Sequence, residues 1–358
     1  MNQIRLEYIW VGGNKELRSK TKVIRTKKNV LKLQDKEICS WDYDGSSTGQ
    51  AEGSNSEVII KPVAIYRDPF RTKNDLLVLC DTWLPNNEPH PTNTRHSAKK
   101  IFDQALEKEP WFGMEQEFFI IDRYTKKPIG FPLNGYPNPQ GQYYCSVGTS
   151  NAFGRDFLEE ALDNCLLAQI PVTGTNFEVC AGQLEIQVCS TGIEQGDNLL
   201  VTRYILQRTA EKYMFNIDFS AKPVKGDWNG SGCHTNFSTK EMRENDNGYQ
   251  LILEAIDKLK NKHMEHIECY GSDNSERLTG LHETAHISEF SSGVANRGAS
   301  IRIPRSTEKK GKGYLEDRRP SSSCDPYVVT SKLFETCCLQ TPPTPHKVLL
   351  PPLPAVLY

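Results

Sequence analysis

The sequence has no hydrophobic run that approaches the roughly 20 apolar residues of a membrane-spanning helix. Residues 1–11 pass directly into strand-like alternation and hold no apolar stretch of signal-peptide length. Both absences exclude membrane-embedded and secreted classes of protein. We therefore predict a soluble, cytoplasmic protein without a membrane partner.

An excess of charge of either sign is also missing. The 43 Lys and Arg residues nearly balance the 45 Asp and Glu residues, which leaves a formal net charge of -2. Nucleic acids and acidic membranes attract strongly basic proteins. The composition therefore predicts no nucleic-acid partner, and the binding of a charged small molecule would have to be local.

Two kinds of motif are absent as well. The 11 cysteines show no paired metal-ligand spacing, and Cys337 and Cys338 are too close for an ordinary disulfide, so we predict reduced thiols. Neither GxxxxGK[ST] nor GxGxxG occurs. A bound nucleotide would have to be held in another way.

The patterns that are present predict an α+β fold in two domains. Residues 4–91 read as short strands and turns, residues 85–94 are rich in Pro and Asn, and the following residues mix strands with amphipathic helices. We place an N-terminal β-rich domain at residues 1–90 and a second domain at 91–340. Residues 341–358 are proline-rich, which predicts an extended or disordered tail.

Residues 111–122 are the stretch around which we expect the rest of the chain to be organised. Aromatic and β-branched residues predict a strand, and its alternation puts Glu115 and Glu117 on one face and Gln116 and Phe118 on the other. Neighbouring carboxylates repel each other unless a cation lies between them. A solvated strand face is the alternative interpretation of the same pair.

Further polar groups follow in the chain. Residues 176–188 repeat the pattern of a strand with one polar face, which carries Glu185, and Glu178 stands near its start. A glycine-rich stretch at residues 226–238 contains His234, which is either a metal ligand or a core imidazole. Helices are predicted at residues 94–106, 155–168, 199–213, 247–266 and near 326–336, and a further strand at 296–305.

Together these groups form a set suited to phosphoryl transfer. Five carboxylates and one imidazole match hard divalent ions such as Mg²⁺ or Mn²⁺ better than zinc; they are Glu115, Glu117, Glu178, Glu185, Glu316 and His234. Arginine forks match carboxylate and phosphate oxygens; the candidates are Arg277, Arg297, Arg302 and Arg318. Metal ions with arginines typically position and neutralise a transferring phosphoryl group.

Several motifs of the chain match those of a known family. The chain resembles eukaryotic-type glutamine synthetase from about residue 8 to about residue 339. Long motifs in the family's order carry the resemblance, at residues 44–48, 111–117, 229–238, 277–280 and 296–320. The resemblance implies an N-terminal β-grasp-like domain and a catalytic domain whose curved antiparallel sheet forms a metal-lined funnel, the glutamine synthetase/guanido kinase-like fold.

The resemblance also implies the reaction, which is ATP-dependent ligation of ammonia to glutamate through γ-glutamyl phosphate. Two metal sites are implied. One comprises Glu117, Glu178 and Glu185 and positions glutamate; the other comprises Glu115, His234 and Glu316 and holds the ATP phosphates.

Roles for the other residues follow from the same resemblance. Asp44 would bind ammonium and take its proton, and Glu283 would close over the intermediate. Glutamate would be held by Asn229, Gly230, Arg277, Arg297 and Arg318, of which the last two also stabilise the transferring phosphoryl group. ATP would contact Trp111, Asn236, Ser238, Arg243, Arg297, Arg302 and Tyr314.

Family members of this type form two stacked pentameric rings, in which Asp44 would come from the neighbouring subunit. This chain departs from the usual pattern in residues 181–184 and 189–191, the second of which replaces a Gly-Pro pair near the nucleotide. Two alternatives remain beside an active synthetase: a γ-glutamyl-amine ligase, and a non-catalytic structural relative. Retained Asp44 and Glu283 argue against the first, and retained ligands argue against the second.

Overall fold

The computed structural model describes residues 2–26, 38–71 and 74–339. Its N-terminal part is a five-stranded sheet in the order β2-β1-β5-β4-β3. The strands are β1 (Asn2–Val11), β2 (Leu17–Thr26), β3 (Trp41–Asp44), β4 (Glu57–Arg67) and β5 (Leu76–Trp83). β1 runs parallel to β5, and the other pairs are antiparallel. The apolar residues of one face, including Leu6, Val58 and Val78, are fully buried in a core of their own.

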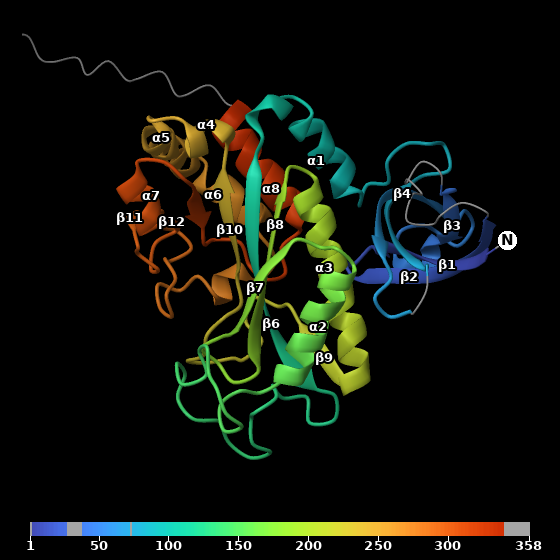
Figure 1. Cartoon of the computed structure of the whole chain (residues 1–358), viewed down its shortest axis with the longest axis horizontal. Coiled ribbons are helices and arrows are strands. Elements are labelled where there is room, and N and C mark those ends of the chain that lie inside the picture. Colours follow the sequence, from blue (N-terminus) through green and yellow to red (C-terminus); the bar gives the residue numbers. More distant parts are fainter. Residues whose placement is uncertain (1, 27–37, 72–73, 340–358) are drawn as a thin grey trace, which may run out of the picture.

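The second sheet follows the order β11-β12-β13-β10-β6-β8-β7, and β9 extends it beside β6. Its central strand is β6 (Trp111–Asp122), the predicted organising strand. Its neighbours are β7 (Val172–Phe177), β8 (Gln183–Thr191), β9 (Phe215–Asp218), β10 (Cys233–Ser238), β11 (Ser292–Val294), β12 (Ile301–Ile303) and β13 (Leu315–Asp317). The sheet is curled, as predicted, and helices cover one of its faces (Figure 1). The opposite, concave face carries a cavity, and we call this side of the sheet the funnel.

Eight α-helices surround this sheet in the described part of the chain. They are α1 (Thr94–Phe102), α2 (Arg155–Leu167), α3 (Glu194–Tyr213), α4 (Lys240–Glu244), α5 (Gly248–Asn261), α6 (His263–Cys269), α7 (Arg305–Lys310) and α8 (Pro326–Phe334). No helix among the described residues is long and apolar enough to cross a membrane. All 11 cysteines lie in the described ranges as free thiols, as predicted.

Helix α3 lies between the second sheet and the N-terminal sheet (Figure 1). It packs against β6 and β8 on one side, where Leu199 and Ile205 are fully buried. The Tyr66 hydroxyl of β4 donates to Asn198 of α3 at 2.9 Å. Arg203 of α3 donates to the Gln116 amide oxygen at 2.8 Å, which confirms that Gln116 faces away from the funnel.

Three sequence predictions need correction. Residues 176–188 are not one strand: β7 ends before Glu178, and a turn with Gly182 at φ 74° leads into β8. The predicted helix at 247–266 is two helices, because the backbone of Lys262 at φ -112° leaves the helical region. Of the strand predicted at 296–305, only residues 301–303 are strand, as β12. The proline-rich tail lies outside the described residues.

Candidate active site

The funnel holds a cavity of about 190 Å³, and strand register brings its acidic residues together. His234 of β10 lies opposite Glu115 of β6. Glu117 of β6 lies opposite Glu185 of β8, and β13 places Glu316 beside β10. Because side chains alternate along a strand, these residues all point to the same face of the sheet. All six predicted metal ligands line this cavity.

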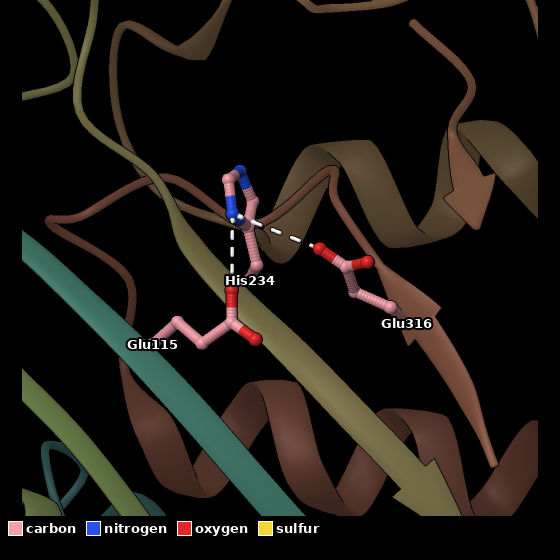
Figure 2. Close-up of side chains that lie close together, drawn as sticks. All are labelled: Glu115, His234 and Glu316. Carbon is pink, nitrogen blue, oxygen red and sulfur yellow. Dashed lines mark ion pairs between the residues drawn. The ribbon is translucent and has the colours of Figure 1, made fainter. Parts of the chain in front are cut away.

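Glu115, His234 and Glu316 form the first group (Figure 2), with ligand atoms within 4.8 Å of one another. His234 Nδ1 lies 3.5 Å from Glu115 Oε2 and 3.9 Å from Glu316 Oε1. Burial, helped by the Arg318 charge, holds the pKa of His234 well below its usual value. The imidazole is therefore neutral and keeps a lone pair for a cation.

Glu117, Glu178 and Glu185 form the second group, again within 4.8 Å. Burial, followed by the charges of the two other carboxylates, holds the pKa of Glu117 well above its usual value. Burial raises the pKa of Glu178 to about 7, and burial together with Glu115 and Glu178 raises that of Glu185 to about 8. Hard oxygen donors gathered with like charges fit a divalent cation such as Mg²⁺ or Mn²⁺.

The predicted arginines lie on the rim and wall of the same cavity. Arg318 donates to Glu316 Oε1 at 2.7 Å, and Arg302 forms an ion pair with the same carboxylate. Arg277 is buried and donates to the carbonyls of residues 318–320, so it also braces the chain after β13. Arg297 is half exposed, with Nη1 3.8 Å from Glu283 Oε2.

A second, larger cavity of about 710 Å³ adjoins the first, because Glu115 and Gln187 line both. Its wall includes the predicted nucleotide residues Trp111, Asn236, Ser238, Arg243 and Tyr314. The predicted nucleotide residues Arg297 and Arg302 line the acidic cavity instead. Trp111 and Tyr314 are 52% and 39% exposed, which leaves ring surface accessible for stacking on a planar group.

Arg243 supports this aromatic wall. Its guanidinium lies 4.0 Å from the Trp111 ring and donates to the carbonyl and hydroxyl of Ser238. Cys189, part of the stretch that departs from the family pattern, lines the same cavity. There β8 continues as regular strand through Thr191, so the altered residues keep the cavity wall in place.

Asp44 does not line either cavity. It lies at the end of β3 in the N-terminal sheet, where it caps the 3-10 turn η3 (Gly45–Thr48). The hydroxyls of Ser46 and Ser47 donate to its carboxylate at 2.6 and 2.7 Å and lower its pKa to about 2. Such a carboxylate is a good cation ligand but a weak base.

Sequence reasoning missed several residues of the acidic cavity, including Tyr144, Asn176, Gln187, His282 and Thr284. Tyr144 lines the cavity together with Arg297 and comes from the loop between β6 and α2, whose sequence carries no periodic signal. The alternation along β8 could have identified Gln187, which donates to Glu185 at 2.7 Å. Asn229 and Gly230, both predicted, do line the cavity.

A funnel with two acidic groups, a ring of arginines and an aromatic cavity defines a metal-dependent phosphoryl-transfer enzyme. A family model described as the glutamine synthetase catalytic domain matches residues 91–258. The chain is 54% identical to a glutamine synthetase nodule isozyme of Lupinus luteus, which covers 94% of this chain and 95% of the relative. It is 53% identical to cytosolic isozyme 2 of Vitis vinifera, covering 95% of each.

A chloroplastic glutamine synthetase of Oryza sativa is 52% identical, over 97% of this chain and 81% of the relative. The chain belongs to the glutamine synthetase family, which confirms the resemblance seen in the sequence. It is a glutamate–ammonia ligase that forms glutamine in an ATP-dependent reaction and uses divalent metal ions.

Proposed function

We propose that each acidic group of the funnel holds one divalent cation, Mg²⁺ or Mn²⁺. Glu117, Glu178 and Glu185 would hold the cation near glutamate, and Glu115, His234 and Glu316 the cation near the ATP phosphates. When bound, the ions supply positive charge to the transferring phosphoryl group. The observation that carries the proposal is that all six side chains line one cavity beside the aromatic one. Strand register brings five of them together, and Glu178 comes from the turn between β7 and β8.

In this proposal the adenine of ATP lies in the 710 Å³ cavity against Trp111 and Tyr314, and Asn236, Ser238 and Arg243 complete its wall. The phosphates reach the acidic cavity, where Arg297, Arg302 and Arg318 neutralise them. The shared wall at Glu115 and Gln187 supports this path from one cavity to the other.

Glutamate is proposed to lie against Asn229, Gly230 and Arg277. An oxygen of its γ-carboxylate attacks the γ-phosphorus of ATP, the bond to the β-phosphate oxygen breaks, and ADP leaves. Ammonia then attacks the carbonyl carbon of the resulting γ-glutamyl phosphate, the bond from this carbon to the phosphate oxygen breaks, phosphate leaves, and the nitrogen loses a proton to give the amide of glutamine. Glu283 closes over this intermediate and keeps water out.

Asp44 is proposed to act from a neighbouring subunit, as part of two stacked pentameric rings. Its low pKa, near 2, favours binding of the ammonium ion over acceptance of its proton. We also propose the division into residues 1–90, 91–340 and 341–358. A cytoplasmic location is proposed from the cytosolic isozymes among the relatives.

Two substitutions, one in each cavity, test these assignments, because each should raise KM for a different substrate. Trp111→Ala is expected to raise KM for ATP by about 10-fold, since base stacking on an aromatic ring contributes about 1–3 kcal/mol, and to leave KM for glutamate unchanged. Asn229→Ala is expected to do the reverse. If both variants raised the same KM, the assignment of the two cavities would be wrong.

A further inference from the structure

Gln183 opens β8 directly beside the second acidic group, yet it does not line the cavity. Its side chain is fully buried, at 0% exposure. The amide Nε2 donates to Glu117 Oε2 at 3.1 Å and to the Gly230 carbonyl at 2.9 Å. One side chain thus contacts both a proposed cation ligand and the loop proposed to hold glutamate.

The orientation of this amide is set by its partners. The Gly230 carbonyl can only accept a hydrogen bond, so the NH₂ group must face it. The amide oxygen of Gln183 then points into the interior, where it has no hydrogen-bond partner among the described residues. An unpaired buried carbonyl is unfavourable. Gln183 tolerates this because both of its donors are used at the site.

The same contact limits what Glu117 can do. Its Oε2 accepts from Gln183 and also from the Gly232 backbone N–H at 2.9 Å. Its Oε1 remains on the side of the cavity, 3.7 Å from His234 Nδ1. Protein donors therefore occupy one carboxylate oxygen and leave the other free for a cation.

We propose that Gln183 is a positioning residue that fixes the orientation of Glu117 and ties it to the Gly230 loop. Gln183 then holds in place both a ligand of the cation in the second acidic group and the loop that binds glutamate. This inference rests on the proposed role of Glu117 as a cation ligand.

Mn²⁺ binding to the purified protein provides the test, by equilibrium dialysis with electron paramagnetic resonance of free Mn²⁺. Replacement Gln183→Met keeps the approximate length of the side chain and removes its donors. It is expected to weaken one bound Mn²⁺ by about 10- to 100-fold and to leave the other unchanged. Its KM for glutamate should rise while KM for ATP stays the same.

Gln195→Met is the matched control. Gln195 is also 0% exposed, donates to a backbone carbonyl, Val188 O, at 3.0 Å, and has an unpaired amide oxygen, but its side chain hydrogen-bonds no carboxylate among the described residues. It reports what the loss of a buried glutamine does to the fold alone. Equal Mn²⁺ affinities in the two variants would overturn the role of Gln183.

A double-variant cycle separates this inference from the proposed site. Glu117→Gln should remove the same ion, and adding Gln183→Met to it should cause no further loss, because the two act through one contact. If wild type and Glu117→Gln bind Mn²⁺ equally, the proposed site is wrong. If Glu117→Gln loses an ion but Gln183→Met does not, only the role of Gln183 is wrong. Should Gln183→Met fail to fold, the isosteric Gln183→Glu takes its place in this comparison.

Discussion

Without a bound cation, the ionised form of several carboxylates in the funnel is unfavourable. Glu185 is 5% exposed, lies opposite Glu117 across the sheet and near Glu115, and receives one neutral hydrogen bond, from Gln187. Burial and these neighbours favour its protonated form. At the proposed metal sites, protons and divalent cations would therefore compete for these carboxylates.

This exchange predicts a pH-dependent effect of Mg²⁺ on stability. The raised pKa values, about 7 for Glu178 and about 8 for Glu185 against an ordinary 4.5, mean that the metal-free fold binds more protons than the unfolded chain. Its free energy of unfolding falls as pH rises from about 4.5 to about 8. Mg²⁺ should consequently raise Tm more at pH 8 than at pH 5.5, measured after chelation and readdition. Equal shifts at both pH values would contradict this account.

At the scale of elements, the loop between residues 277 and 290 stands over the acidic cavity in a strained form. His282 and Glu283 both have positive φ, 52° and 59°, which costs about 1 kcal/mol for each such residue. Among the contacts that hold the loop, His282 Nε2 lies 2.8 Å from Asp227, and Arg318 donates to the Glu283 carbonyl at 3.4 Å. The first contact links this loop to the one that carries Asn229 and Gly230.

Asp227→Asn tests whether the contact keeps water out. The variant should increase phosphate released per glutamine formed by about 2- to 5-fold, a modest effect because the Asp227 side chain is 91% exposed. Parallel assays of phosphate and glutamine measure the ratio. Glu276→Gln removes another exposed ion pair nearby, with Lys225, and should not change the ratio. An unchanged ratio in Asp227→Asn would rule out a closing role for the contact.

Elements with strong local periodicity were predicted well from the sequence, and breaks in the chain were not. The alternation of residues 111–122 predicted β6 and the shared face of Glu115 and Glu117. The end of α5 at Lys262 depends on one backbone conformation that the apolar pattern of residues 247–266 does not record. Glu178 lies in a turn whose position depends on pairing between β7 and β8. Periodicity reports a local face, whereas turns and pairing are set by tertiary contacts.

The same limit applied to the site. Acidic residue types predicted what could bind a cation, but the distances between β6, β8, β10 and β13 come from register that residues far apart in sequence create. Tyr144 and His282 lie on loops without a periodic pattern, so no sequence signal identifies them. The separation of Asp44 from both cavities likewise follows from the arrangement of the two sheets.

At the scale of the whole molecule, the distance of Asp44 from the funnel predicts sites shared between subunits. Asp44→Ala and Glu185→Ala should each be inactive alone. Mixed by reversible dissociation and reassembly, they should regain activity in roughly a quarter of sites, because one neighbour supplies the intact Asp44 and the other the intact funnel. Glutamine formation by the mixture is the measurement.

As the control, each variant is dissociated and reassembled with a second preparation of itself, which should restore no activity. The assembly itself should have a mass of about 400 kDa by light scattering, ten times the 40.5 kDa chain. Full activity of a chain that sediments as a monomer would contradict a shared site.

The most direct test of the central account measures phosphate release and glutamine together, from ATP, glutamate and Mg²⁺, with and without ammonium. The account predicts that ammonium stimulates phosphate release, that glutamine appears in equal amount, and that Glu185→Ala loses both by at least about 100-fold. Glu159→Ala, an exposed acidic residue of α2, should behave as wild type. Ammonium-independent phosphate release, or full activity in Glu185→Ala, would contradict the account.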